Sequence, residues 1–476
     1  MASPHVSFDT LPASIRKPGK YFEFNTRLAV RTLPSNVQRV CIIAGKTDAG
    51  ELPVHTPTEV YSDLEARLYA GPGSLGHLMC RAAIKAYPYI RLTLVTVADA
   101  QAGLAAAGSV AFAGAASKSG VITLYIGAEA YRVAVLRTWT AADTAAAFIH
   151  LINAAQLSPV TASVDAEALD TLVLTARHKG IDGNLIPLRL ENTTEGQTAA
   201  LTPMSGGQVN PDLADAFASI FAAGHQVIII PYTDAESLEA FRDHLDATGH
   251  ALEQRGAVGA TALTGTLAQA TTLASSVNAG RTTIALLPGT PSLPCEVAAA
   301  YGAVISSEED PARPLNTLEL NGIAVPPLER RLGRTEQETA LYGGITPLEV
   351  GPGDKVQIVR AISTYTLDPQ GIEDISLLDI TTIRTLDYVR KACRERISLR
   401  FPREKLSART APKVRSELID VLLKLEDLEI VEEVKANLPG LVVERDSQDP
   451  NRLNAAIPCD VVNGLHVFAG RIDLLL

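Results

Sequence analysis

Residues Gly71 to Gly76 match the GxGxxG pattern, whose glycines let a backbone approach the pyrophosphate of a dinucleotide. Asp99 follows roughly twenty residues later, where such sites place an acidic residue for the ribose. The pattern also requires a strand directly before the first glycine, but residues 59–69 read as a helix. We therefore interpret the glycines as a helix-to-helix turn, with an NAD-binding α/β enzyme as the alternative.

A hydrolase of the Ser/His/Asp type needs a nucleophile on a sharp turn with a histidine beside it. The sequence has no GxSxG motif. The segment around Ser74 comes near to it, but Pro72 occupies the position of the first glycine. His178 and His225 are the most interesting histidines, and we interpret each as a surface or capping residue. No HExxH, P-loop or EF-hand pattern occurs in the sequence. We predict no enzyme, no catalytic residue, no cofactor and no metal.

The composition fits a multidomain globular protein. The chain has 476 residues, 46% hydrophobic and 20% charged, with a net charge of -11. This charge argues against nucleic acid or an acidic membrane surface as partner. Its five cysteines form no CxxC pair and are expected to be reduced thiols. We find no secretory signal and no stretch apolar enough for membrane insertion, so we expect synthesis and retention in the cytoplasm.

The strand Val227–Ile230 is the element around which the chain is organised. Its β-branched run has no polar alternation, which is typical of a parallel strand buried on both faces. Pro231 ends the strand, and Asp234 can cap the next helix. The alternation then continues with strands at 257–262 and 283–287 and helices at 266–277 and 294–305. This pattern predicts a parallel sheet covered by helices on both sides.

The segments before this strand divide into two kinds. Strands at 37–44 and 91–97 and helices at 59–69 and 75–86 extend the same α/β pattern. Between 99 and 206 the sequence instead predicts an inserted α+β domain at a loop of the core. Its expected elements are one helix at 141–155 and short strands at 110–113, 121–126, 131–136, 172–176 and 185–190.

The two ends of the chain are β-prone. After a strand at 356–366 and helices at 380–397 and 413–434, a last strand covers 466–476. The first 26 residues are broken by prolines and cannot form a stable sheet alone. These end segments must add to a sheet in their own chain or in a neighbouring one. The residues that we expect to carry this role are Val6, Phe8, Tyr21, Phe22, Phe24, Val467, Phe468, Ile472 and Leu474.

A basic stretch stands out in this acidic chain between residues 384 and 405. One interpretation is a charged helix face. The other is a patch that meets an acidic protein surface and fixes register. The candidate contact residues are Arg390, Arg394, Arg396, Arg400 and Lys405.

Taken together, short motifs along the chain resemble the tail sheath proteins of contractile-tailed bacteriophages, in particular the Mu-like branch. They occur in the order of that family and span nearly the whole chain. The matching pieces are Thr175–Gly180, Gly183–Asn184, Pro231–Asp234, Asp310–Leu315, Ser363–Tyr365, Gly371, Asp374, Leu378–Asp379, Pro402–Leu406 and Asp449–Arg452.

This resemblance implies a subtilisin-like, doubly wound α/β core without proteolytic activity, an outer α+β insertion and an inner α+β C-terminal domain. It also implies terminal β-strand arms that pair with neighbouring subunits. The expected divisions are 1–26 (arm), 27–98 and 207–362 (core), 99–206 (insertion), 363–464 (C-terminal domain) and 465–476 (arm).

The same resemblance implies partners and a location. The chain would form hexameric rings, stacked as a helical tube around the tail tube protein, and meet baseplate and tail terminator proteins. It would be assembled in the host cytoplasm and reside in the virion tail. The sheath of a phage-derived, pyocin-type injection particle is the alternative within this class. The basic stretch is then our candidate for the tube-facing surface.

Overall fold

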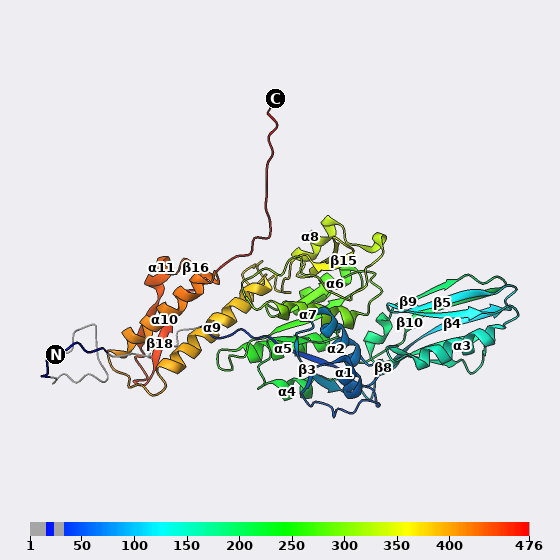
Figure 1. The fold of residues 1–476 in the computed structure, drawn as a ribbon, viewed down its shortest axis with the longest axis horizontal. Coiled ribbons are helices and arrows are strands. Elements are labelled where there is room, and N and C mark those ends of the chain that lie inside the picture. The colour runs from blue at the N-terminus through cyan, green and yellow to red at the C-terminus, as the bar shows by residue number, and fades with distance from the viewer. Residues whose placement is uncertain (1–15, 23–32, 476) are drawn as a thin grey trace.

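The computed structural model describes residues 16–22 and 33–475. The chain is elongated, with a mostly helical unit at one end, a large sheet in the middle and a β-rich unit at the other end (Figure 1). We call residues 380–461 the C-terminal unit and residues 105–205 the inserted unit. The final residues leave the body as an extended segment, visible at the top of Figure 1.

The central sheet has eight strands in the order β15-β14-β13-β12-β11-β1-β3-β2. Six of them run parallel, and β2 and β15 close the two edges in antiparallel pairing. The predicted parallel sheet is confirmed, because β11 pairs with β1 on one side and β12 on the other. The strands are β1 Arg39–Gly45, β2 Thr58–Val60, β3 Arg91–Val97, β11 Val227–Ile229, β12 Val258–Leu263, β13 Thr282–Leu286, β14 Thr346–Gly351 and β15 Lys355–Ile358.

Helices cover both faces of this sheet, so the fold is mixed α/β. Along β1, Val40 and Ile42 belong to one core cluster, whereas Cys41 and Ile43 belong to the other. Successive strand residues point to opposite faces, which explains a strand without polar alternation. The first face is covered by α1 Asp63–Ala70, α2 Leu75–Ala86 and α7 Pro294–Ser307, and the second by α4 Ala214–Ile220, α5 Ala235–Gly249, α6 Leu267–Val277 and α8 Arg334–Tyr342.

Local signals explain where these elements begin. The Asp234 carboxylate accepts from the Ser237 backbone N–H at 3.0 Å and caps α5, as predicted. The helix expected from residue 59 instead begins at Asp63. That part of the prediction is wrong because Val60 is an edge-strand residue paired with Leu92 of β3.

The inserted unit forms two sheets of its own, ordered β10-β4-β8-β7 and β6-β5-β9. Helix α3 packs on them, and its Phe148 stacks on Phe112 at 5.8 Å between ring centroids. The sequence pattern missed β7 and β10, since β7 is only five residues long and β10 contains three residue types, alanine, serine and proline, that are not typical of strands. The elements are β4 Ala105–Gly114, β5 Gly120–Ile126, β6 Glu129–Val135, α3 Ala141–Ala154, β7 Val160–Val164, β8 Thr171–Lys179, β9 Leu188–Asn192 and β10 Gln197–Ser205.

The C-terminal unit is a helix pair with two small antiparallel ribbons. Helix α10 ends at Asp427, so the prediction of a helix to residue 434 is wrong. The reason is that Val431 pairs with Val461 and Glu433 adopts a positive φ of 52°. The elements are α9 Ile380–Arg400, α10 Thr410–Asp427, β16 Val431–Glu432, α11 Val434–Asn437, β17 Val442–Arg445, β18 Leu453–Ala456 and β19 Asp460–Val461.

Two further strand predictions need correction. β15 ends at Ile358 rather than near residue 366, because the backbone N–H of Ser363 bonds to Leu378 and that of Thr364 to Thr282. We expected a last strand at 466–476. In the structure this segment is extended through residue 475 but pairs with no other described strand.

Candidate functional site

The GxGxxG segment is the turn between α1 and α2, as we interpreted it. Gly71 and Gly73 have φ angles of 89° and 69°, which favour glycine, and no strand precedes them. The Ser74 hydroxyl accepts from the His77 backbone N–H at 3.1 Å and caps α2. The segment therefore shapes a loop and does not match a dinucleotide site.

The start of α1 and the start of α2 bring together the three residue types of a serine hydrolase, namely Ser74, His77 and Asp63. Their hydrogen bonds, however, do not match those of a catalytic triad. His77 Nε2 lies 3.1 Å from the Asp63 carboxylate, while His77 Nδ1 accepts from the Gly73 N–H at 3.1 Å. Nδ1 is therefore occupied and cannot take a proton from serine. The Ser74 hydroxyl itself donates to the Gly71 carbonyl and is fully buried.

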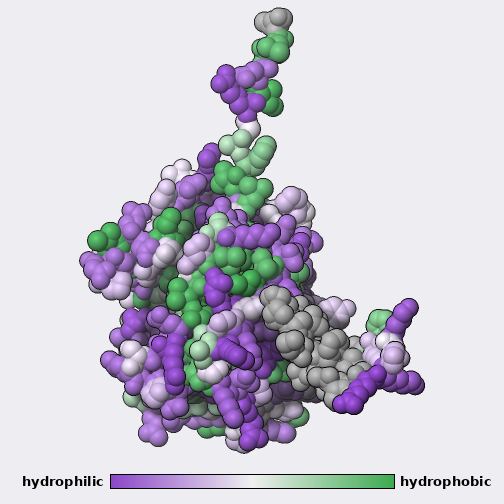
Figure 2. All heavy atoms as spheres, turned by 90° about the vertical axis from the view of Figure 1, so that its left-hand side faces the viewer, coloured by the Kyte–Doolittle hydropathy of each residue, from purple (hydrophilic) through white to green (hydrophobic). Residues whose placement is uncertain are grey.

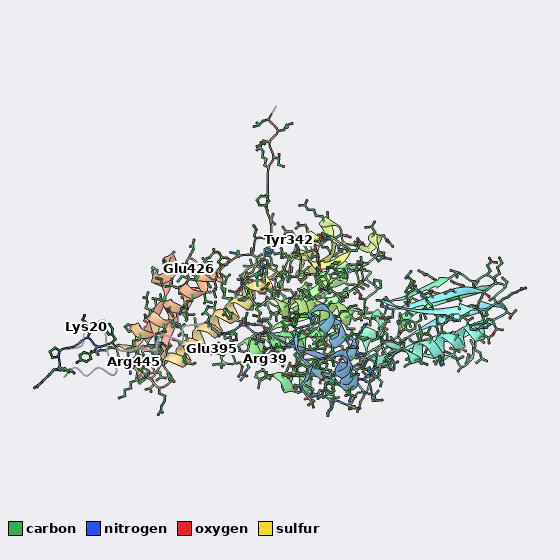
Figure 3. The ribbon with its side chains drawn as sticks, viewed as in Figure 1. Lys20, Arg39, Tyr342, Glu395, Glu426 and Arg445 are labelled. Atoms are coloured by element: carbon green, nitrogen blue, oxygen red, sulfur yellow. The ribbon has the colours of Figure 1, made fainter. Side chains whose placement is uncertain are left out.

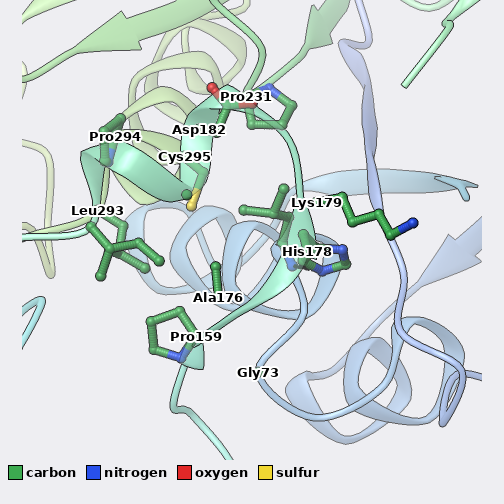
Figure 4. A pocket seen from close by; sticks show the side chains of 13 residues that line it. Gly73, Pro159, Ala176, His178, Lys179, Asp182, Pro231, Leu293, Pro294 and Cys295 are labelled. Carbon is green, nitrogen blue, oxygen red and sulfur yellow. Dashed lines mark hydrogen bonds between the residues drawn. The ribbon is translucent and has the colours of Figure 1, made fainter. Parts of the chain in front are cut away.

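A small cavity of about 40 Å³ lies where the inserted unit joins the central sheet (Figure 4). His178 and Cys295 line it but do not form a nucleophile–base pair. His178 Nε2 accepts from the Leu75 N–H at 3.0 Å, and its Nδ1 lies 3.1 Å from Asp99. Burial raises the pKa of the Cys295 thiol well above its usual range, so the sulfur stays protonated. His178 and Cys295 therefore do not form a catalytic pair in this cavity.

Both histidines singled out from the sequence are buried, so the surface interpretation is wrong for each. The capping interpretation holds for His178, which bonds to the first turn of α2. His225 is 6% exposed and lies 3.3 Å from the Thr93 hydroxyl. Burial and the nearby Arg39 lower its pKa to about 4, so it is neutral near pH 7.

The C-terminal arm is the most exposed apolar segment of the described chain. His466 anchors its base through a 3.0 Å hydrogen bond with Asn316. No described residue covers the apolar side chains of the arm, and apolar surface of this kind marks an interaction site. The exposed residues are Leu465, Val467, Phe468, Ile472, Leu474 and Leu475, at 79–98% exposure.

Of the expected N-terminal contact residues, the structure describes only two. Tyr21 is 41% and Phe22 87% exposed. Val6, Phe8 and Phe24 lie outside the described residues. Tyr21 is held locally by a 3.0 Å hydrogen bond from its hydroxyl to the Lys17 carbonyl.

The C-terminal unit presents unpaired strand edges. Among the described residues, the ribbons β17–β18 and β16–β19 have two strands each, so one side of each strand pairs with no other described strand. Such edges can accept a strand from another chain. Figure 2 looks at this end of the molecule and shows hydrophobic side chains exposed between hydrophilic ones. Exposed apolar residues of the unit include Leu399, Leu428 and Val442.

Most of the basic stretch is engaged inside the chain. Arg390 donates to the Gly249 carbonyl at 2.8 Å and Arg394 to the Gln254 carbonyl at 3.3 Å, which ties α9 to the core. Arg396 is only 5% exposed and pairs with Glu417 and Asp420 of α10.

Arg400 also pairs with Glu417, at 3.0 Å. Lys405, in the loop after α9, is exposed. Figure 3 shows charged side chains along this unit, among them Glu395 and Arg445. Hence the charged-helix interpretation accounts for the four arginines, while contact with the tube stays a prediction.

Comparison with known proteins decides the family. Residues 206–364 match the phage tail sheath protein central domain, and residues 373–474 match the phage tail sheath C-terminal domain. The Mu-like prophage FluMu tail sheath protein of Haemophilus influenzae is 33% identical over 489 residues, covering 99% of this chain and 100% of that protein. The chain belongs to the phage tail sheath family. The resemblance stated from the sequence, including its Mu-like branch, is therefore confirmed.

Solved sheath structures share the fold. The sheath tail protein of Desulfitobacterium hafniense has a TM-score of 0.51 at 14% identity, with 94% of this chain and 97% of that chain covered. The sheath tail protein Lin1278 of Listeria innocua has the same TM-score at 13% identity, covering 91% and 94%. A chain of the anti-feeding prophage baseplate has a TM-score of 0.51 at 12% identity, covering 97% and 100%.

This sheath chain is thus a structural component of contractile tails and not an enzyme. The prediction of a phage tail sheath protein is confirmed at that level. In the described part of the chain no helix is long and apolar enough to cross a membrane. What the family does not supply is the residue-level assignment of surfaces, which we propose below.

Proposed function

We propose that this chain polymerises as stacked hexameric rings around a tail tube and contracts to drive that tube through the host envelope. The observation that carries the proposal is the exposed apolar C-terminal arm in a chain of the tail sheath family. A heterologous contact repeated with a rotation and a rise builds an open helical filament. The interior surface of such a filament would hold the tube, and its two ends would meet baseplate and terminator proteins.

The exposed apolar side chains of the C-terminal arm favour burial against a partner chain. Fully burying one large apolar side chain stabilises by about 1.5–3 kcal/mol. Six such side chains are exposed in the arm. Ordering about ten residues at about 1–2 kcal/mol each offsets a gain of this size, so docking also needs the backbone hydrogen bonds that a strand forms when it pairs with a sheet. The N-terminal arm would act in the same way through Tyr21 and Phe22.

We assign the β17–β18 ribbon of a neighbouring subunit as an acceptor for these arms. In the part of the chain that the structure describes, neither outer edge of this ribbon pairs with a further strand, and the ribbon belongs to the C-terminal unit. Residues 16–22 lie near this end of the molecule in Figure 1, so arms and acceptors of adjacent copies would meet there. Strand exchange of this kind keeps its backbone hydrogen bonds while rigid bodies rotate about the arms as hinges.

The elongated shape supports a radial placement of the parts. The C-terminal unit and the inserted unit lie at opposite ends of the long axis (Figure 1). With the C-terminal unit innermost, Lys405 is a candidate to face the tube. The central sheet between them would be the subtilisin-like core without proteolytic activity, and 99–206 the outer domain.

In the mechanism that we propose, contraction needs no nucleotide. The extended sheath would be metastable and held by a kinetic barrier until the baseplate releases it. At about 25 cal/mol per Å², a few hundred Å² of extra contact per subunit supplies several kcal/mol, multiplied over many rings.

Negative-stain electron microscopy of the purified chain, alone and with its tube protein, tests the proposal. We expect hollow striated cylinders. A particle that stays monomeric under all conditions would overturn it. A pyocin-type particle would give the same cylinders, and the presence or absence of DNA in the complete particle separates it from a phage.

A further inference from the structure

A basic cavity of about 260 Å³ lies at the junction between α9 and the end of the central sheet. One wall is α9, and the other is formed by the start of β1, the turn before β11 and the loop before β12. Figure 3 shows Arg39, from the start of β1, at the end of the sheet that faces α9. We call this space the junction cavity. The basic side chains that line it are Arg39, Arg255, Arg384, Arg390, Lys391 and Arg394.

The spacing of the basic residues on α9 brings them to the cavity. Arg384, Lys391 and Arg394 are separated by seven and three residues, so they lie on one face of the helix. The loop before β12 comes very close to the same face. A Cβ added at Gly256 would lie 2.0 Å from the Asp387 carboxylate, so this close approach requires glycine. The two walls are therefore held close together.

Several of these cations donate to backbone carbonyl groups, which carry no net charge. The pairs are Lys391 with Ser35 at 2.8 Å, Arg394 with Gln254 at 3.3 Å, and Arg384 with Glu308. Neither these three cations nor Arg39 makes an ion pair with any residue that the structure describes. The hydrogen bonds thus fix the side chains in place but leave their positive charge uncompensated.

Carboxylates at the junction are already engaged. Among the described residues that line the cavity, Asp387 is the one acidic residue, and it is shared between Arg281 and Arg390. Glu253 is paired with Arg255 at 2.7 Å. These two carboxylates face three guanidinium groups, so they have no charge left for the other cations.

Arg384 is the cation for which the missing countercharge matters most. Its side chain is 7% exposed, and its Nη1 atom has no hydrogen-bond partner among the described residues. Burial lowers the pKa of Arg384 to about 10, although Glu308 and Asp310 act in the opposite direction. Glu395 also lies on α9, but it is exposed and does not line the cavity. An anion beside Arg384 would offset the free energy of burying its charge.

Cations on the two walls repel one another across the cavity. Arg39 contributes its charge from the sheet side, whereas Arg384, Lys391 and Arg394 contribute theirs from α9. Burial lowers the pKa of His225 to about 4, and the positive charge of Arg39 adds to this effect. An anion between the walls would be attracted by both and would hold α9 against the sheet.

We propose that the junction cavity binds a small oxyanion of the phosphate type, which bridges the central sheet and α9. Guanidinium groups bind phosphate through paired N–H donors, and a lysine adds a point charge. A phosphate dianion can meet cations on both walls at once, whereas a single carboxylate has one charge to share. The site does not depend on polymerisation, so it stands or falls separately from the proposed function.

Isothermal titration of the full-length chain with inorganic phosphate, at constant ionic strength set by sodium chloride, tests the site. We expect saturable binding in the millimolar range or tighter. Arg39→Gln and Arg394→Gln change exposed side chains, so circular dichroism should stay unchanged while phosphate affinity falls at least tenfold. Arg137→Gln is the matched control, because it removes the same charge from an exposed position in the inserted unit and should bind phosphate like wild type. Acetate should bind at least tenfold more weakly than phosphate.

Limited proteolysis gives a second readout, for the bridging role. Phosphate should slow cleavage at the start of α9 in wild type and in Arg137→Gln, but not in Arg39→Gln. The absence of phosphate binding by wild type, equal affinity in all three variants, or acetate that binds as tightly as phosphate would overturn the site. Equal protection of Arg39→Gln and Arg137→Gln would overturn the bridge between α9 and the sheet. None of these results bears on whether the chain forms tubes.

Discussion

The Arg281 guanidinium makes a two-pronged ion pair with the Asp387 carboxylate, at 2.6 and 3.0 Å. Arg281 directly precedes β13 and Asp387 lies on α9, so this pair joins the central sheet to the helix that leads into the C-terminal unit. The two side chains are 11% and 20% exposed. Paired groups shielded in this way are costly to separate.

We expect Asp387→Asn to loosen this junction. The variant leaves Arg281 without its countercharge, which should lower the free energy of unfolding by about 2 kcal/mol. Limited proteolysis should cut near residue 380 sooner than in wild type. Glu239→Gln, which removes the exposed partner of Arg242, is the matched control and should change nothing measurable. Equal proteolysis of the two variants would contradict the role of the pair.

Removal of residues 465–476 should leave the body of the chain folded. None of these residues except His466 hydrogen-bonds to the body within the described chain. The thermal midpoint should therefore shift by only a few degrees, whereas tubes should disappear in electron micrographs. Arg471→Ala, in the same segment, keeps the apolar residues and should still assemble. Normal tubes from the truncated chain would rule out the strand exchange by this arm.

We expect two kinds of residue in the basic stretch, those that stabilise the C-terminal unit and those that contact the tube, and substitutions should distinguish them. Arg396→Glu places a negative charge against Glu417 and Asp420, so it should destabilise the C-terminal unit. Lys405→Glu should leave the thermal midpoint unchanged and weaken co-sedimentation with the tube protein severalfold, because Lys405 is exposed. Unchanged tube binding by Lys405→Glu would direct attention to another inner surface.

Two buried histidines should make the chain acid-sensitive. Burial lowers the pKa of both His225 and His244 to about 4, so the unfolded chain binds protons that the native chain excludes between pH 6.5 and 4. Stability is therefore lost as pH falls through this window, by up to roughly 3 kcal/mol per group.

Since His244 stacks on Phe217 at 4.7 Å, His244→Phe preserves the packing and should flatten the acid limb of a midpoint-versus-pH curve. His150→Phe, at an exposed position, should not flatten it. An identical acid limb in wild type and His244→Phe would assign the sensitivity to other groups.

The sequence could predict what depends on strong local patterns. The β-branched run at Val227, the Asp234 cap and the apolar stripe of α10 each specify an element with few competing structures. Edge strand β2 and the true end of α10 could not be predicted in this way, because pairing partners distant in sequence determine them. Val60, for example, becomes a strand residue only because Leu92 lies beside it.

The candidate surfaces show the same limit. The apolar arm could be predicted from composition, because no local partner exists for Val467 or Phe468. The burial of Arg396 could not, since its partners come from the next helix.

The unpaired C-terminal arm has a consequence for the ends of a finished tube. In the interior of a polymer every arm and every acceptor ribbon can find its complement. On our proposal, the first ring keeps one kind of site empty and the last ring keeps the other. The filament is then polar, with growth that distinguishes its two ends. A single capping protein could not close both, which gives a chemical reason for two different end-binding partners.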